Sequence, residues 1–423
     1  MNYLSVTIEV LKSNKNVFLT GGAGVGKTTI TREIIKAYEE DAKKVAKLAS
    51  TGMAATLIGG QTLHSFLDLG IASSLKELEL NGKLELSKKV KKIIAVMDLV
   101  VIDEISMVSD SLLDMIQLRL LQANFRGVLL VVGDFLQLPP VVRGSSEVRF
   151  AFESCAWSEF GFNKIELTHI YRTDDEYFIE LLNSVRFGHI NETTHNHLNE
   201  FIKPLGEDLS EFTFLFGKNE SASWHNKRQL SFIENELFVK QAQIVRHVQS
   251  VKDAEIERYM NDARIEKELE LKVGVPVLFT RNSWNYFNGE RGIIVNIESN
   301  FIYVQKSDER VVKLEAVAQS KGMWKEKTVD GKKEMVEENL FSVYQFPIKL
   351  AFAITIHKSQ GMSIMDLIIE TNEIFAPSQF YVALSRSSNP LRLNLIAPRK
   401  QWHELAFVNK KALDFVKGIK FLA

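Results

Sequence analysis

The stretch from Val17 to Thr29 constrains the fold of this chain more than any other feature. A short apolar run (Val17 to Leu19) breaks into a glycine-rich turn, and a helix-forming run follows from Thr28 to Tyr38. The turn matches the pattern G-x-x-x-x-G-K-[ST] at every specified position: Gly21, Gly26, Lys27 and Thr28. A strand, this turn and a helix together form a phosphate-binding loop. The alternative is a chance glycine turn before an amphipathic helix, which the flanking strand and helix disfavour.

Each residue type in this loop has a physical role in phosphate binding. Glycines let backbone N–H groups close around phosphate oxygens, so we expect contacts from Gly22, Gly24, Val25, Gly26 and Thr29. Lys27 is expected to reach the β- and γ-phosphates, and the Thr28 hydroxyl to hold Mg²⁺. The sequence therefore predicts a site for a nucleoside triphosphate.

Composition sets limits on the class of protein. A chain of 423 residues with 45% hydrophobic and 25% charged residues has room for two or three globular domains. The net charge is −1, so any nucleic-acid binding must come from a local groove. A single cysteine, Cys155, excludes an intrachain disulfide. No export signal and no apolar run of membrane-spanning length is present, which favours a cytoplasmic enzyme.

Apolar runs alternate with helical patterns through the first half of the chain. The runs Val45 to Ala49, Leu99 to Ile102 and Gly127 to Val132 read as buried strands, and residues 1–16 read as one helix. This alternation predicts a doubly wound parallel α/β sheet, in which ligands bind at the carboxyl ends of the strands.

Polar residues stand at those carboxyl ends. Asp103 and Glu104 end one strand, where Asp103 is expected to hold Mg²⁺ and Glu104 to orient or deprotonate the attacking water. Gln137 follows the next strand and can report loss of the γ-phosphate, because its amide both donates and accepts. The alternatives are an acidic helix cap and a rigid loop without a role. Arg172 and Arg386 are candidates to stabilise charge on the transferring phosphate, although a surface salt bridge explains Arg172 equally well.

Two clusters have the composition of a nucleic-acid contact. The first offers hydroxyls, an imidazole and a ring (Thr51, Thr62, His64 and Phe66), and the second combines Thr355, His357 and Lys358. Such groups suit phosphate contact and base stacking. For the first cluster the alternative is a packed Phe66 beside a capping Thr62.

Two stretches differ from the rest of the chain in composition or in the pattern of apolar residues. Residues 67–95 are rich in Leu, Lys and Glu, and we read them as a small insertion whose lysines at 88–92 form a solvated helix face. A second α/β unit begins near Phe212, and between Ile297 and Phe346 short alternating strands predict an all-β insertion. Aromatic residues around Trp284 are candidates for base stacking or for core packing. The histidines at 189, 195 and 197 lack further ligands at metal-binding spacing.

Taken in order, these motifs resemble a superfamily 1 DNA helicase of the Pif-one and RecD-like group. The resemblance covers nearly the whole chain and rests on eight stretches: Gly21 to Thr29, Ala49 to Ala55, Thr62 to Phe66, Val101 to Ser106, Gly133 to Pro140, Tyr171-Arg172, Ile354 to Gly361 and Tyr381 to Arg386. It is closest to the Pif-one type. One departure is that residues 1–16 contain no glutamine, which such helicases usually use to read adenine.

The resemblance implies two RecA-like motor domains built on doubly wound parallel sheets. The first would span residues 1–205 with a wedge insertion at 67–92, and the second residues 206–296 and 346–423 with a β-barrel insertion at 297–345. ATP and Mg²⁺ would bind with Lys27, Glu104, Gln137, Arg172 and Arg386 as catalytic residues and Gly361 among the nucleotide contacts.

The implied activity is ATP-dependent 5′→3′ unwinding of DNA by a protein that acts as a monomer on single strands and at their junctions with duplex. Replication, repair, recombination and telomere maintenance are the processes this implies. Two alternatives stay open. One is a translocase that is stimulated by single-stranded DNA and separates strands poorly, and the other is a nucleotide-switch binding module that signals without moving.

Overall fold

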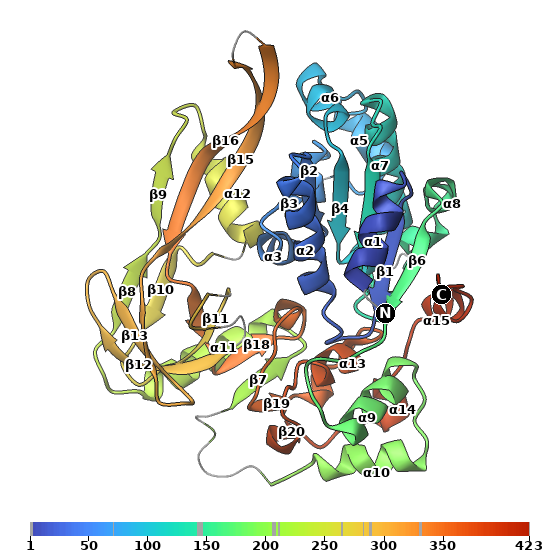
Figure 1. Cartoon of the computed structure of the whole chain (residues 1–423). Helices are drawn as coiled ribbons and strands as arrows, with labels where there is room; N and C mark the ends of the chain where they lie inside the picture. The colour runs from blue at the N-terminus through green and yellow to red at the C-terminus, as the bar shows by residue number, and fades with distance from the viewer. Residues whose placement is uncertain are drawn as a thin grey trace. The chain divides into compact units, whose positions relative to one another are not determined.

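The computed structural model describes residues 3–70, 72–141, 147–204, 209, 212–263, 265–281, 283–286, 290–329 and 332–422. The chain forms two compact units (Figure 1). Unit 1 comprises Met1–Tyr171, Lys321–Leu340 and Asn409–Ala423, and unit 2 comprises Arg172–Ser320 and Phe341–Val408.

Unit 1 is built on a six-stranded sheet in which all strands run parallel. Its order is β3-β2-β4-β5-β1-β6, with bounds β1 (Val17–Gly21), β2 (Val45–Ala49), β3 (Gln61–Thr62), β4 (Leu99–Asp103), β5 (Val128–Val132) and β6 (Asn163–Leu167). In β1, β4 and β5 every residue is buried, as continuous apolar strands covered on both faces require. The parallel sheet predicted from the apolar runs is therefore confirmed, with strand ends within about two residues of the predicted ones.

Helices cover both faces of this sheet. The helices of unit 1 are α1 (Tyr3–Lys12), α2 (Lys27–Glu40), α3 (Gly52–Leu57), α4 (Leu63–Phe66), α5 (Leu75–Leu80), α6 (Lys88–Ala95), α7 (Asp110–Gln122), α8 (Cys155–Phe160), α15 (Lys410–Lys417) and the 3₁₀ turns η1 (Ile105–Met107) and η2 (Ala151–Glu153). Helices α1 and α2 cover one face, where Leu11 and Ile34 pack on Val17 and Leu19 of β1 (Figure 1). Phe18 lies between those two residues in the strand, so its side chain points to the other face.

Unit 2 contains a smaller parallel sheet of four strands in the order β18-β7-β19-β20. The strands are β7 (Thr213–Phe216), β18 (Ala353–Thr355), β19 (Leu367–Ile369) and β20 (Leu393–Leu395). Its helices are α9 (Glu176–Arg186), α10 (Glu192–Glu200), α11 (Asn219–Phe232), α12 (Asp253–Ala263), α13 (Gln379–Leu384), α14 (Trp402–Leu405) and the 3₁₀ turns η3 (His357–Ser359), η4 (Thr371–Glu373) and η5 (Pro390–Arg392). Although the resemblance implies a first domain extending to residue 205, α9 and α10 lie in unit 2, where α9 packs against α13.

The remaining strands are antiparallel where their pairing is described. A five-stranded sheet has the order β14-β13-β12-β11-β17, and smaller sheets pair β10 with β8 and order β15-β16-β9. The bounds are β8 (Phe238–Gln241), β9 (Gln243–Arg246), β10 (Glu268–Leu271), β11 (Pro276–Phe279), β12 (Arg291–Ile297), β13 (Ile302–Lys306), β14 (Val311–Leu314), β15 (Val317–Val329), β16 (Lys332–Gln345) and β17 (Ile348–Leu350).

The five-stranded sheet is wider than the predicted insertion. It begins at Pro276 and closes with β17, whereas the sequence places the all-β stretch at 297–345. The difference arises because β11 and β12 share one apolar core with β13 and β14, so a boundary at 297 cuts through a packed sheet. In the loop before β12, Trp284 is 93% exposed while Tyr286 is buried and stacks on Phe279 at 4.4 Å. Phe287, Asn288 and Gly289 lie outside the described residues.

Candidate functional site

The phosphate-binding loop joins β1 to α2 as the sequence predicts. Gly24 and Gly26 have φ values of +80° and +83°, a left-handed conformation that side-chain-bearing residues rarely adopt. Gly21 is constrained differently, since a Cβ there would lie 2.3 Å from the backbone oxygen of Leu167. Val25 is buried in the core, so it can offer only its backbone N–H to a ligand. The loop is therefore shaped by its glycines and anchored by one apolar side chain.

Lys27, the first residue of α2, folds back onto this loop. Its ammonium group donates to the backbone oxygens of Gly21 at 2.9 Å and Gly22 at 2.7 Å. A phosphate oxygen is a better acceptor for an ammonium than a neutral carbonyl. Thr28 is half-buried and Thr29 exposed on the first turn of the helix. The lysine is thus held where a phosphate would bind.

Asp103 and Glu104 stand at the carboxyl end of β4. Asp103 is 5% exposed, and its Oδ1 accepts the Glu104 N–H at 2.8 Å. Burial, and then the charge of Glu104, raise the pKa of Asp103 to about 7, while Lys27 and Arg32 oppose that rise. Glu104 has φ 55° and ψ 49°, a strained conformation of the kind found at functional sites. A divalent cation beside this carboxyl would favour its charged form further than Lys27 and Arg32 do.

The segment after β5 carries Gln137 in a tight turn. The N–H of Gln137 donates to the Asp134 backbone oxygen at 2.9 Å, and the N–H of Leu136 donates to the Asp134 carboxylate at 3.1 Å. Both Asp134 and Gln137 are buried. A Cβ on Gly133 would lie 2.9 Å from the Ile105 nitrogen, beside Glu104. The turn therefore lies against the segment that carries the two carboxylates.

Unit 2 brings Arg172 and Arg386 together. Arg172 donates through Nε to the Ser363 hydroxyl at 2.9 Å and through Nη1 to the Ser385 backbone oxygen. Arg386 donates to the Ser385 hydroxyl at 2.8 Å and to the Val382 oxygen at 2.9 Å. Burial, and then the charge of Arg386, lower the pKa of Arg172 to about 9. Two residues that are 214 positions apart thus share one serine.

The residues predicted to contact DNA are ordered by local hydrogen bonds. Thr51 accepts the Ala54 N–H at 3.2 Å, Thr62 caps α4 through the Ser65 N–H at 3.4 Å, and Thr355 accepts the Lys358 N–H at 3.3 Å. His64 is half-buried on α4, two residues after Thr62.

Phe66 and His357, two predicted DNA-contact residues with rings, have different surroundings. Phe66 is 9% exposed, which favours core packing over base stacking. His357 lies 6.4 Å from the exposed ring of Phe375, and Gly361 has φ 76°. Binding of DNA by these residues stays a prediction.

The structure adds two neighbours that sequence reasoning gave no role. The ring of Tyr171 lies 3.6 Å from the position that a Cβ on Gly26 would occupy. The backbone N–H of Tyr171 donates to the Gly24 backbone oxygen at 2.9 Å. Arg32 binds the Leu57 oxygen twice, at 2.9 and 2.6 Å, and its charge acts on Asp103. Arg32 lies five residues after Lys27 in the same helix, a spacing that marks a nearby position but not a role.

Among the residues that the structure describes, no three His, Cys, Asp or Glu side chains gather as a metal site would require. None of the helices described is long and apolar enough to cross a membrane.

Comparison with known proteins places this arrangement in a family. The PIF1-like helicase family matches residues 4–196. The ATP-dependent DNA helicase Pif1 of Campylobacter jejuni is 36% identical over 98% of this chain and 97% of its own. The crystal structure of Bacteroides Pif1 with ADP-AlF4 is similar with a TM-score of 0.84 at 28% identity, covering 99% and 96% of the two chains. Bacteroides Pif1 in complex with ADP-AlF3 and ssDNA gives a TM-score of 0.66 at 28% identity over the same shares.

These similarities span both units, so the chain has the RecA-like α/β fold that the motif resemblance implies. The 36% identity to the Campylobacter jejuni protein extends over 98% of this chain, so it includes both units. The chain belongs to the family of PIF1-like helicases.

Proposed function

We propose that this protein is an ATP-dependent DNA helicase. The observation that carries the proposal is the carboxyl edge of the unit 1 sheet. There Lys27 folds over its glycine loop, Asp103 is buried with a raised pKa, and the Gln137 turn lies against the segment of Glu104. The names of the relatives, which are ATP-dependent DNA helicases, support the same activity.

The residues at this edge fit a magnesium nucleotide. A divalent ion beside Asp103 would offset the burial that raises the pKa of this carboxyl, so the buried group suits a cation. We assign Thr28 and Asp103 to this ion, which supplies neutralisation of the phosphate charge when bound. Lys27 would exchange its two carbonyl acceptors for phosphate oxygens. These assignments use only the ligand atoms and hydrogen-bond donors that Thr28, Asp103 and Lys27 provide.

Glu104 and Gln137 would act on the water and the terminal phosphate. Glu104 directly follows Asp103 with a left-handed backbone at the end of β4, and its carboxylate would accept the proton of the attacking water. Gln137 leaves a turn closed by Asp134, so its amide starts from a fixed backbone. Arg172 and Arg386 would stabilise charge on the phosphoryl group in transfer.

We further propose single-stranded DNA as the partner and 5′→3′ as the direction of movement. The solved Bacteroides relative that holds single-stranded DNA supports the first point. The contact residues would be Thr51, Thr62, His64, Thr355, His357 and Lys358 of the predicted set, while the buried ring of Phe66 belongs to the core. We also propose action as a monomer, a preference for junctions with duplex and a wedge at 67–92. The β insertion would comprise the five-stranded sheet that begins at Pro276 and closes with β17, in place of the predicted range 297–345. A cytoplasmic location completes the proposal.

One set of assays tests the activity and its direction. Lys27→Ala should abolish ATP hydrolysis, because the ammonium that binds the phosphates is gone, while oligo-dT should accelerate hydrolysis by the wild type. Duplexes with a 5′ or a 3′ single-stranded tail then report polarity. Unwinding solely from the 3′ tail would reject the direction. Displacement of streptavidin without strand separation would indicate the translocase instead.

A further inference from the structure

A cluster of aromatic rings lies beneath the turn that carries Gln137. It consists of Phe18, Phe135, Phe150, Phe152, Trp157 and Phe415, all in unit 1, and we call it the aromatic cluster. Phe135 is at its centre, with ring centroids 5.5 Å from Phe18 and 5.5 Å from Trp157. Its remaining neighbours are Phe152 at 4.9 Å, Phe415 at 5.4 Å and Phe150 at 6.2 Å. One ring is thus held on several sides by others.

Phe135 is part of the Gln137 turn. It follows Asp134, whose backbone oxygen accepts the Gln137 N–H, and its side chain is 1% exposed. Because only Leu136 separates Phe135 from Gln137, a shift of the ring moves the backbone from which the Gln137 amide extends. On the other side the ring contacts Phe18 of β1, the strand that leads into the phosphate-binding loop. The aromatic cluster therefore supports both segments.

Phe415 reaches this cluster from α15, more than 250 residues further along the chain. Its ring stacks on Phe152 with centroids 4.1 Å apart and planes 4° apart, and it meets Phe135 edge to face at 86°. These are the favoured geometries of aromatic pairs. Phe150 also stacks on Phe152, with ring centroids 5.2 Å apart and planes 9° apart, so Phe152 stacks on two rings.

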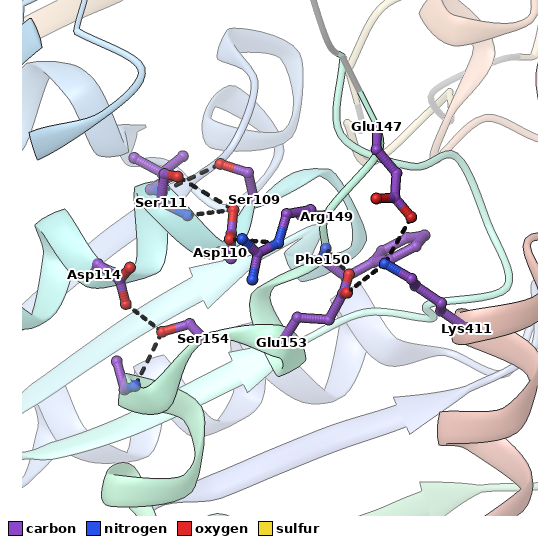
Figure 2. Close-up of polar contacts among 12 residues, drawn as sticks. Ser109, Asp110, Ser111, Asp114, Glu147, Arg149, Phe150, Glu153, Ser154 and Lys411 are labelled. Carbon is purple, nitrogen blue, oxygen red and sulfur yellow. Dashed lines mark hydrogen bonds and ion pairs between the residues drawn. The ribbon is translucent and has the colours of Figure 1, made fainter. Parts of the chain in front are cut away.

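Polar contacts fix α15 in this position (Figure 2). The Lys411 ammonium lies 2.8 Å from a Glu147 carboxylate oxygen and 2.9 Å from one of Glu153. Glu153 in turn accepts the Phe150 N–H at 2.8 Å, so the same carboxylate joins α15 to the backbone of a cluster residue. Beyond the helix, the N–H of Leu422 donates to the Lys164 oxygen of β6 at 2.8 Å. The helix is attached at both ends.

We propose that α15 is a positioning element for Gln137, acting through Phe415 and Phe135. The inference rests on the proposed function, in which Gln137 acts at the terminal phosphate. Removing the Phe415 ring removes one of the rings that contact Phe135, so Phe135 and the backbone of the Gln137 turn can shift. Since a displacement of about 1 Å at a catalytic group costs about 100-fold in rate, we expect turnover to fall by about 10- to 100-fold while nucleotide affinity is kept. If the cluster only contributes stability, turnover at a temperature where the protein is folded stays unchanged.

The test compares full-length variants. Phe415→Ala removes the ring, Phe415→Leu keeps most of the apolar volume, and Phe160→Ala is the matched control. Phe160 contacts Phe162 at 5.7 Å at the margin of the same region, and its described ring contacts do not include Phe135. For each variant we would measure the melting temperature, the affinity for a fluorescent ADP, and kcat and KM for ATP hydrolysis with oligo-dT. Phe415→Ala should lose kcat at unchanged KM, Phe415→Leu should recover most of it, and Phe160→Ala should lose melting temperature only.

A double variant separates positioning through Gln137 from a general loosening of the site. If α15 acts through Gln137, Gln137→Ala combined with Phe415→Ala hydrolyses ATP no more slowly than Gln137→Ala alone. Additive losses would overturn the proposal, as would a Phe415→Ala variant whose kcat equals that of the wild type or falls no more than in Phe160→Ala. If oligo-dT does not accelerate ATP hydrolysis by the wild type, the proposed function itself is rejected. This outcome is measured on the wild type alone, so it is distinct from any difference between the variants.

Discussion

We predict that Arg119 holds together the insertion that follows Phe66. It lies in α7, is 1% exposed, and donates to four backbone oxygens at the two ends of one segment: Leu67 at 3.1 Å, Asp68 at 3.4 Å, Lys83 at 2.6 Å and Leu84 at 2.9 Å. A fifth bond, at 3.0 Å, goes to the Gln122 side chain. One guanidinium thus closes the base of the insertion, and burial lowers its pKa.

The cost of losing this group follows from the acceptors it leaves. Arg119→Met keeps the apolar stem but leaves four backbone oxygens without a charged donor. A buried acceptor without a partner costs about 1–3 kcal/mol. The Leu84 oxygen keeps the Gln122 amide at 3.0 Å, so three oxygens lose their partner. Allowing that one of these three regains water, and that the buried guanidinium no longer has to be desolvated, we expect local opening to become easier by about 3 kcal/mol. Each 1.4 kcal/mol is tenfold, so the open population of residues 67–84 rises by about 100-fold.

Limited trypsin digestion measures this opening, because the segment and the following helix carry lysines at 76, 83, 88, 89, 91 and 92. When reclosing is fast, the cleavage rate tracks the open population. The matched control is Arg126→Met, which removes an exposed arginine after the same helix. Equal cleavage rates in the two variants would refute the reasoning. If the insertion acts as a wedge, Arg119→Met also loses duplex unwinding to a larger extent than ATP hydrolysis.

Three further predictions concern single positions. Gly21→Ala should cost about 3–5 kcal/mol and abolish nucleotide binding, because its Cβ would lie 2.3 Å from the Leu167 oxygen at a φ of +141°; normal binding and melting would contradict this. Arg386→Lys should retain ATP binding and lose on the order of 10³-fold in turnover, measured with oligo-dT, since an ammonium lacks the planar fork of the guanidinium; unchanged turnover would remove Arg386 from the site. The pKa of His225 is lowered by burial and then by Arg228, so the unfolded state binds the proton more readily. Protonation of His225 therefore subtracts stability as the pH drops below about 6.5, opposite in sign to the contribution of the buried Asp103. The difference in stability between the wild type and His225→Phe in urea titrations should change over that range; a difference independent of pH would exclude His225 as a contributor.

The first half of the chain was accessible to sequence reasoning for a physical reason. In a parallel sheet covered on both faces, a strand must be apolar throughout and its carboxyl end must turn toward the ligand edge. The runs ending at Gly21, Asp103 and Val132 satisfy both conditions within a few residues of sequence. Local pattern and site therefore coincide, and the strand positions can be predicted together with the polar residues that follow them.

The contacts that hold the insertion and the Gln137 turn lack such a local signature. Arg119 resembles any arginine of an amphipathic helix, and only the fold brings four carbonyl oxygens to it. Phe415 and Phe135 are separated by most of unit 2, and their contact depends on the return of the chain to unit 1. The same limit applies to Trp284 and Tyr286, two aromatic residues of one loop that end at opposite extremes of exposure. Exposure is decided by the packing of β11, which the loop sequence does not encode.

Asp103 and Arg172 show what the fold adds to residues that motifs had already identified. Burial raises the pKa of Asp103 to about 7 and lowers the pKa of Arg172 to about 9, so burial disfavours the charged form of each residue. A cation relieves the first and an anion the second. A magnesium nucleoside triphosphate carries both charges. In the proposed function, a cation beside Asp103 and an anion beside Arg172 would therefore each gain free energy by pairing with a charge that burial disfavours.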